Sequence, residues 1–243
     1  MYSLTEHMPR DVEDFYPEEV CYFDLEGISF AQISQIDTYP DAESLAKVSD
    51  LFYDEALRLR DKYKLQIKLP IGFESEWIRP STLPLIHNLR EKFSFDFFVG
   101  SVHHVHAIPI DFDRKMYEEA RNQAGGTDEK LFQDYFDTQY DMLQKLKPPI
   151  VGHFDLVRML SDDGNRSFKQ WEGVWSGLLR NLKFIANYRG VLEINSAAFR
   201  KGLSEPYPQV EICKVCQLHF KTHSFVLIAA GIFETWRPFL LVR

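Results

Sequence analysis

Helical and strand-like patterns of apolar residues alternate along most of this chain. Between Leu45 and Leu59 an apolar residue recurs at steps of three and four, which predicts an amphipathic helix over about 42–63. Similar stripes predict further helices over 81–92, 128–146, 168–185 and 207–220. Apolar runs predict the intervening strands, over 65–73, 95–102, 150–151, 191–194 and 224–230. Strands that alternate with helices indicate βαβ units, a mainly parallel sheet and the α/β class.

Turn-forming residues punctuate this pattern. Thr127 follows two glycines and is a predicted N-cap for the helix that begins at about 128, and Pro148 is predicted to stop that helix. Gly190 stands where a helix C-cap is expected. Pro70 interrupts the predicted strand 65–73. No repeat or low-complexity linker divides the chain, so residues 1–243 are predicted to form one domain.

The composition is that of a globular protein and limits the classes of partner that the chain is expected to bind. Of 243 residues, 45% are hydrophobic and 14% aromatic, which is ample for a core, and α/β barrels of this size are common as single units. The net charge of −8 argues against a general nucleic-acid or anionic-membrane surface, although it leaves room for a small basic pocket.

The expected compartment is the cytoplasm. No apolar run approaches the roughly 20 residues of a membrane span, and residues 1–10 are polar, without the apolar segment of a signal peptide. Three cysteines do not make a disulfide framework, which indicates a reducing environment.

Candidate metal ligands follow four apolar runs. They are His7, Glu74, His103 and His153. In a barrel of βαβ units the chemistry collects at the C-terminal ends of the strands, and His with carboxylate is a ligand set of hydrolytic Zn, Fe and Mn centres. One such residue alone is more often solvated or bonded to a loop. Because such residues recur at four predicted strand ends, a metal site and a metal-dependent hydrolase are favoured.

Neighbouring residues suggest supporting roles. Asp155 is expected to orient the His153 imidazole as a partner behind the ligand. Strand alternation would place His104 and His106 on one face and His103 on the other. His103 comes first after the apolar run, so it is preferred as the ligand, with His104 and His106 in a loop or supporting role.

Two further motifs each have a simpler explanation. Asn195, Arg200 and Lys201 follow a predicted strand and suit a phosphate group, the alternative being a solvated basic turn. The pattern Cys213-x2-Cys216-x2-His219-x3-His223 has only two residues between its pairs, where a Cys2His2 zinc finger needs about twelve. Helix packing is therefore preferred there. No nucleophile elbow, P-loop or dinucleotide-binding glycine pattern occurs.

Taken together, these motifs resemble the PHP-type histidinol-phosphatases, especially the fungal form. The matching segments occur in the family's order over about 1–214, and 215–243 differ from it. They are Leu4-Thr5-Glu6-His7-Met8-Pro9-Arg10, Gly72-Phe73-Glu74, Gly100-Ser101-Val102-His103-His104-Val105, Gly152-His153-Phe154-Asp155, Leu192-Glu193-Ile194-Asn195-Ser196 and Arg200-Lys201-Gly202-Leu203-Ser204-Glu205-Pro206-Tyr207-Pro208.

The resemblance implies a distorted (β/α)7 barrel that holds up to three divalent metal ions. It also implies hydrolysis of L-histidinol phosphate to L-histidinol and phosphate, a step of histidine biosynthesis. By motif, His7, Glu74, His103 and His153 would be metal ligands, and Asn195, Arg200 and Lys201 would lie near the substrate. The metal is Zn, Fe or Mn, since all three accept mixed His and carboxylate sites. The expected partner is this small phosphorylated substrate, with no nucleic acid and no membrane.

The sequence differs from the family pattern at both ends. The family's His-x-His motif does not precede His7, and no aspartate follows Asp163, so the family's Asp-x-His motif does not occur. The barrel and its metal cluster are therefore expected to be incomplete at both ends of this chain. Two alternatives stay open beside an impaired phosphatase: an inactive PHP paralogue or isoform that binds a phosphorylated metabolite or partner, and a PHP phosphoesterase with another small substrate.

Overall fold

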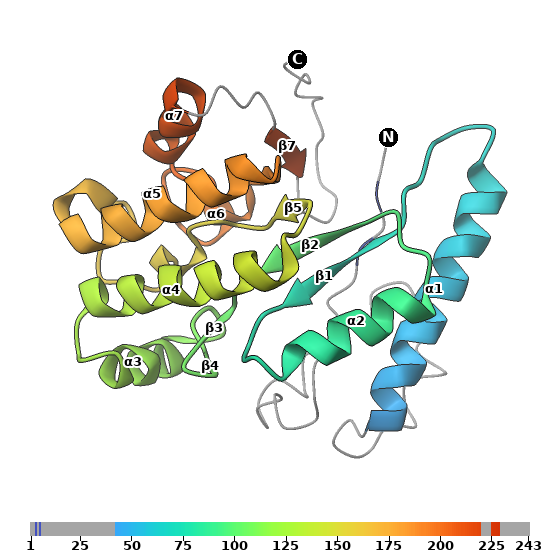
Figure 1. The fold of residues 1–243 in the computed structure, drawn as a ribbon, viewed down its shortest axis with the longest axis horizontal. Helices are drawn as coiled ribbons and strands as arrows, with labels where there is room; N and C mark the ends of the chain where they lie inside the picture. Colours follow the sequence, from blue (N-terminus) through green and yellow to red (C-terminus); the bar gives the residue numbers. More distant parts are fainter. Residues whose placement is uncertain (1–2, 4, 6–41, 220–224, 229–243) are drawn as a thin grey trace.

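The described part of the fold is built on a parallel five-stranded sheet. The computed structural model describes residues 3, 5, 42–219 and 225–228. The strand order is β1-β2-β5-β6-β7, and every neighbouring pair is parallel (Figure 1). The strands are β1 (Gly72–Glu76), β2 (Phe97–Ser101), β5 (Ile150–Val151), β6 (Val191–Asn195) and β7 (Phe225–Ile228).

Helices connect these strands, as parallel pairing requires. They are α1 (Ala42–Tyr63), α2 (Thr82–Lys92), α3 (Arg114–Gln123), α4 (Asp128–Leu146), α5 (Glu172–Asn187), α6 (Ala197–Arg200) and α7 (Val210–His219). Two single turns of 3-10 helix, η3 (Leu156–Arg158) and η4 (Phe168–Gln170), lie in the connection between β5 and α5. A small antiparallel hairpin, β3 (His104–Val105) with β4 (Ile108–Pro109), follows β2.

The register of the strands separates an apolar face of the sheet from a polar one. Partners in the ladder share a face, so Phe73, Phe98, Val151 and Leu192 lie on one side of the sheet, and all four are buried. The opposite face carries Glu74 and Glu76 of β1, Ser101 of β2, and Glu193 and Asn195 of β6. The strands of a fully buried parallel sheet are usually apolar throughout, so a row of acidic residues on one face indicates a functional site.

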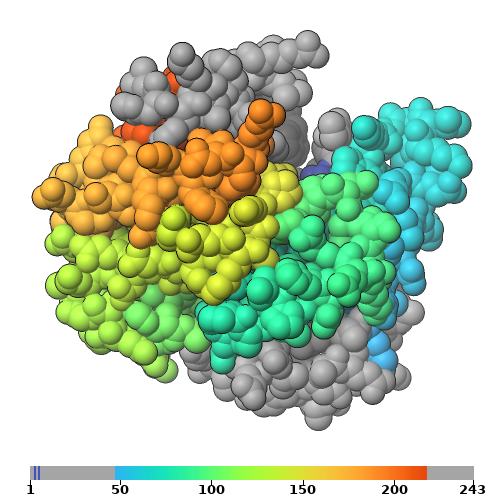
Figure 2. Space-filling view, in the orientation of Figure 1, coloured from blue at the N-terminus to red at the C-terminus, as the bar shows by residue number. Residues whose placement is uncertain are grey.

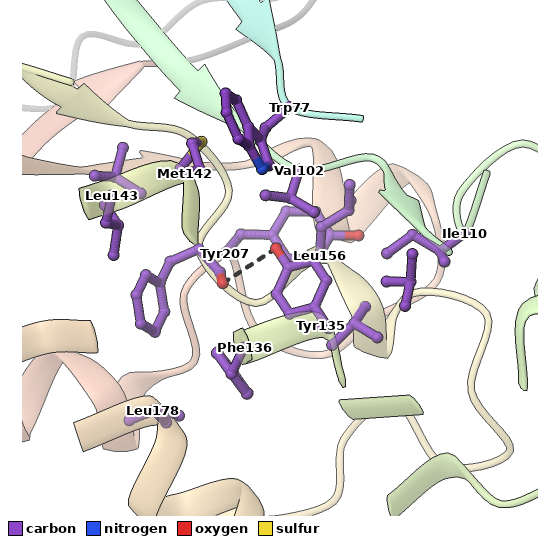
Figure 3. Packing of buried hydrophobic residues seen from close by; sticks show 14 of the residues in the cluster. Trp77, Val102, Ile110, Tyr135, Phe136, Met142, Leu143, Leu156, Leu178 and Tyr207 are labelled. Atoms are coloured by element: carbon purple, nitrogen blue, oxygen red, sulfur yellow. Dashed lines mark hydrogen bonds between the residues drawn. The ribbon is translucent and has the colours of Figure 1, made fainter. Parts of the chain in front are cut away.

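The apolar face packs against α4 and α5, which lie side by side (Figure 1). In the space-filling view the two helices meet along their length (Figure 2). Tyr135 and Phe136 of α4 lie close to Leu178 of α5 and to Leu156 in the core (Figure 3). Gly100 has no room for a side chain, because an added Cβ would lie 2.5 Å from Pro148 Cγ, so the end of α4 closes over this strand.

Most predicted elements are present, and their capping follows the sequence. The helix predicted over 128–146 is α4, and the Thr127 side chain accepts a hydrogen bond from the Lys130 N–H, as an N-cap does. The helix ends at Lys147 in a left-handed conformation, directly before Pro148. The helices predicted over 42–63 and 81–92 are α1 and α2.

Two predictions were wrong in detail. Strand β1 begins at Gly72 rather than Leu65, and residues 64–70 are turn or irregular structure, because a proline cannot donate to a ladder and Pro70 lies in this run. The predicted C-cap glycine, Gly190, is not the residue with positive φ after α5. Arg189 takes that conformation, with φ 63°, and the Gly190 N–H donates to the Ile185 carbonyl.

The structure confirms the α/β class and the parallel sheet. Closure into a seven-stranded barrel, its incompleteness at both ends and a single domain over 1–243 remain predictions. Within the region that differs from the family motifs, β7 pairs with β6 from Leu192↔Phe225 to Asn195↔Ile228. Among the described residues, no helix combines the length and apolar composition needed to cross a membrane.

Candidate metal centre

Three of the four predicted ligands come together on the polar face of the sheet. Glu74, His103 and His153 offer donor atoms that all lie within 4.8 Å of one another. Glu74 Oε1 is 3.1 Å from His153 Nε2 and 3.7 Å from His103 Nε2. The two imidazoles meet edge to face, with ring centroids 4.6 Å apart. His7, the fourth predicted ligand, lies outside the described residues.

These distances suit donors to one metal ion. For metal–ligand bonds of 2.0–2.1 Å, the edge of a tetrahedron is about 3.4 Å long. The two measured separations from Glu74 Oε1, 3.1 and 3.7 Å, lie on either side of that length. Two imidazole nitrogens and one carboxylate oxygen are also a donor set of three-residue catalytic zinc sites. The residues present therefore fit a divalent metal ion.

Secondary structure positions the three donors differently. Glu74 is the middle residue of β1 and not the last, so the prediction that it ends a strand was wrong. His103 lies two residues beyond β2, where strand alternation places it on the face that carries Ser101 and the acids. His153 lies two residues beyond β5, after Gly152, whose N–H donates to the Gly100 carbonyl. Both histidines are thus at the carboxyl ends of neighbouring strands.

The electrostatic surroundings of His153 are strongly negative. Burial alone would lower the pKa of its imidazole, but the hydrogen bond and charge of Glu74, aided by Glu193 and Asp111, raise that pKa to about 9. Carboxylates that stabilise an imidazolium also stabilise a metal ion at the same position.

Sequence reasoning missed two acids of this face. Glu76 is buried, and its Oε1 is 3.8 Å from His103 Nδ1. Glu193 is buried, and its Oε2 accepts the His153 backbone N–H at 2.6 Å. Burial raises the pKa of the Glu193 carboxyl. The signal was present in the sequence as Glu74-x-Glu76 and Glu193-x-Asn195, since residues two apart in a strand share a face.

The expected role of Asp155 was wrong. No hydrogen bond from Asp155 to the His153 imidazole is found; instead Asp155 Oδ2 pairs with Arg158 Nε at 3.0 Å and accepts the Gln209 N–H at 2.9 Å. Both charged side chains are fully buried, and burial raises the pKa of the Asp155 carboxyl despite the guanidinium beside it. Asp155 therefore fixes the chain before α7 and does not orient the ligand.

The other histidines after β2 have separate places. His104 begins β3 and is buried, whereas His106 lies in the β3–β4 turn with φ 56°. His106 Nε2 is 2.8 Å from Asp134 Oδ2, and both side chains are about one-third exposed. This agrees with the preference for His103 as the member of the site.

The predicted substrate residues are spread over the end of β6 and over α6. Asn195 is buried, its side-chain amide donates to Glu193 Oε1 at 3.1 Å, and its Oδ1 accepts the Ala197 N–H at 2.8 Å. Arg200 and Lys201 are exposed at the end of α6. A buried cation that was not predicted, Arg158, donates to the carbonyls of Gly164, Glu205 and Pro206.

The cysteine pair packs as a helix face. Cys213 is half-buried in α7, and Cys216 is buried within the core cluster. Both are free thiols. Of the patterned histidines, the His219 side chain and His223 lie outside what the structure describes, so the preference for helix packing over zinc stays a prediction for the full motif.

Comparison with known proteins agrees with this geometry. The family model described as PHP domain matches residues 1–197. A Saccharomyces cerevisiae protein named "Histidinol-phosphatase" is 32% identical over 241 residues, covering 90% of this chain and 70% of the relative. The chain therefore belongs to the PHP domain family, within its fungal-type histidinol-phosphatase group.

Further relatives extend the comparison. A Schizosaccharomyces pombe protein described as "Probable histidinol-phosphatase" is 41% identical over 216 residues; the match covers 88% of this chain and 65% of that relative, so the chain spans about two-thirds of its length. HisK from Listeria monocytogenes has a similar fold, with TM-score 0.70, 19% identity and coverage of 93% of this chain and 81% of that one. A HisK structure from Lactococcus lactis, in complex with Zn, L-histidinol and phosphate, aligns with TM-score 0.56 and 22% identity, over 73% and 64% of the two chains.

Proposed function

We propose that this chain is a metal-dependent phosphomonoesterase that hydrolyses L-histidinol phosphate to L-histidinol and phosphate, in histidine biosynthesis. The observation that carries the proposal is the convergence of Glu74, His103 and His153 from three elements onto one point. Membership of a family whose fungal members are named histidinol-phosphatases supports this substrate. The alternative of an inactive, binding-only protein is not favoured by these observations.

Glu74, His103 and His153 are the proposed ligands of a divalent ion, Zn, Fe or Mn, with His7 as a further ligand. Such an ion would neutralise phosphoryl charge and activate water for attack on phosphorus. The chain's part is to hold the donors rigidly and away from bulk solvent: His103 and His153 are both more than 90% buried. Phosphate monoesters hydrolyse very slowly without catalysis, so this preorganised charge must supply much of the acceleration.

Asn195, Arg200 and Lys201 are the proposed substrate contacts. Arg200 and Lys201 provide exposed positive charge at the end of α6, the short helix that follows β6, and this charge would attract a phosphate dianion. The Asn195 amide already has a partner at each end within the chain, so it would contribute its second N–H or hold the turn into α6.

The test is phosphate release from L-histidinol phosphate by the purified chain, supplied with Mn or Zn. We expect release that a chelator abolishes and that His153→Ala reduces by at least 100-fold. His106→Ala is the matched control, because it removes a histidine whose ion pair lies on the surface. A folded, metal-loaded chain that releases no phosphate but is thermally stabilised by it would favour the binding-only alternative. Faster phosphate release from another phosphate monoester would show that L-histidinol phosphate is not the preferred substrate.

We also propose that the chain works in the cytoplasm. Cys213 and Cys216 are free thiols, as is usual for proteins of reducing compartments. A fluorescent fusion expressed in yeast would test this, and accumulation in an organelle would contradict it.

A further inference from the structure

Glu193 occupies an unusual position beside the proposed metal centre. The residue is only 5% exposed and lies on the polar face of the sheet. Oε2 accepts the His153 backbone N–H at 2.6 Å, and Oε1 accepts the Asn195 side-chain amide at 3.1 Å. Each oxygen therefore already has a donor from the chain.

The bond to His153 joins two strands at a point where the ladder has ended. Strand β5 consists only of Ile150 and Val151, and its last ladder partner in β6 is Leu192. Beyond Val151 the chain turns away through Gly152 into His153. The Glu193 side chain replaces the missing ladder bond and ties the His153 backbone to β6.

The space around this tie leaves little freedom. A Cβ on Gly152 would lie 2.3 Å from Ser101 Oγ and 3.5 Å from Glu193 Oε2, so β2 and Glu193 leave no room for a side chain at this turn. On its other side, the Phe154 carbonyl accepts Gln139 Nε2 at 2.9 Å. The His153 carbonyl accepts the Leu156 N–H at 2.9 Å. Of these contacts that hold the backbone around His153, only the one with Glu193 has a charged partner.

We propose that Glu193 is a positioning residue that sets His153 for metal binding, a role that rests on the proposed metal site. Its charge-assisted bond fixes the His153 backbone, and its buried negative charge favours a cation at the imidazole. Its bond to Asn195 passes the same constraint to the end of β6. Glu193 itself does not need to touch metal or substrate.

Glu193→Gln separates this role from a merely structural one. Glutamine has nearly the same shape, and its single amide oxygen can accept only one of the two bonds. Loss of one of the two buried hydrogen bonds should lower the thermal stability of the metal-free chain. The affinity for Zn²⁺, measured by competition with a chromogenic chelator, should fall by about 10–100-fold. A purely structural residue would lower stability in the same way but leave the Zn²⁺ affinity unchanged.

Glu211→Gln is the matched control. Glu211 also accepts a backbone N–H, that of Phe168 at 2.7 Å, but it lies on α7 and has no contact with the three donors. This variant should lose thermal stability and keep the Zn²⁺ affinity of the unmodified chain. Glu193→Asp, which keeps the charge on a shorter side chain, should recover part of the lost affinity.

A direct readout is the His153 amide proton in spectra of the chain labelled with 15N-histidine. In the metal-free chain this signal should move upfield in Glu193→Gln, because a carboxylate acceptor is replaced, and should stay in place in Glu211→Gln. Unchanged Zn²⁺ affinity in Glu193→Gln, or an unmoved His153 amide signal, would overturn the proposal. If the unmodified chain does not bind Zn²⁺, the proposed metal site is wrong. The amide signal would then test only whether Glu193 holds the His153 backbone.

Discussion

At the scale of single residues, one carboxylate oxygen of Glu74 lies close to both histidines of the site. Glu74 Oε1 is near both His103 and His153, so removing that carboxylate would leave two buried imidazoles facing each other. His103 and His153, the proposed ligands, could be selected from the sequence, because each follows an apolar run. The proposed role of Glu193 could not, because it depends on β5 lying beside β6, and Glu193 is 40 residues from its partner His153.

The thiols of α7 give a prediction about pH. Burial raises the pKa of Cys213 to about 11 and that of Cys216 to about 12. Both thiols should stay protonated at pH 8 and react slowly with iodoacetamide in the native chain, but rapidly in urea. The pKa of each thiol is higher in the folded chain than in the unfolded chain, where it is about 8.5. The protonated thiols therefore contribute their full stability below the unfolded pKa, and this contribution is lost as the pH rises toward the folded values. Peptide mapping of the alkylated cysteines checks this, and native labelling as fast as in urea would contradict the burial.

At the scale of elements, the Asp155–Arg158 pair joins η3 to the segment before α7. Asp155→Asn keeps the side-chain size but leaves Arg158 as a buried charge without its counterion. We expect a loss of about 3–5 kcal/mol in the free energy of unfolding, measured by urea titration. Asp162→Asn is the control, because Asp162 is 63% exposed and pairs with Arg114 and Arg121, where solvent screening leaves an ion pair little effect on stability. Similar losses in both variants would show that the buried pair has no special role.

The turn after β5 also leaves little room for change in how it packs against β2. Gly152→Ala places a Cβ 2.3 Å from Ser101 Oγ and 2.9 Å from Val99 Cγ1, so the turn or β2 must move. Overpacking of this kind should cost about 1–3 kcal/mol of stability, and the shift should also weaken Zn²⁺ binding through His153.

Gly177→Ala provides the opposite case on α5. The added Cβ would lie 3.5 Å from Phe136 Cβ, an ordinary contact, and alanine favours a helix by about 1 kcal/mol over glycine. This variant should be equally or more stable in the same urea titration, with unchanged Zn²⁺ affinity. Destabilisation by Gly177→Ala, or none by Gly152→Ala, would contradict the packing described around these glycines.

At the scale of the whole molecule, the alternation of elements was enough to predict the α/β class. The helical stripes are long and bounded by Thr127, Pro148 and similar signals, so their limits were close to those observed. Strand β5 was predicted at 150–151, as observed, but the predicted bounds of β1 were wrong, because Pro70 obscures where that strand begins. The polar face of the sheet was hidden for another reason: it depends on strand order and register, and these bring together residues distant in sequence.

Metal binding should stabilise the fold as a whole, because the three donors come from separate segments that the unfolded chain does not hold together. At free Zn²⁺ of 100 times the dissociation constant, linkage gives about 2.7 kcal/mol, which corresponds to a rise in Tm of about 5–10 °C for a chain of this size. Calorimetry with and without Zn²⁺ measures the rise, and EDTA should reverse it. His153→Ala should lose most of the rise, whereas His106→Ala, which alters only a surface pair, should keep it. An equal rise in His153→Ala would show that Zn²⁺ binds elsewhere, and the assignment of Glu74, His103 and His153 as ligands would be wrong.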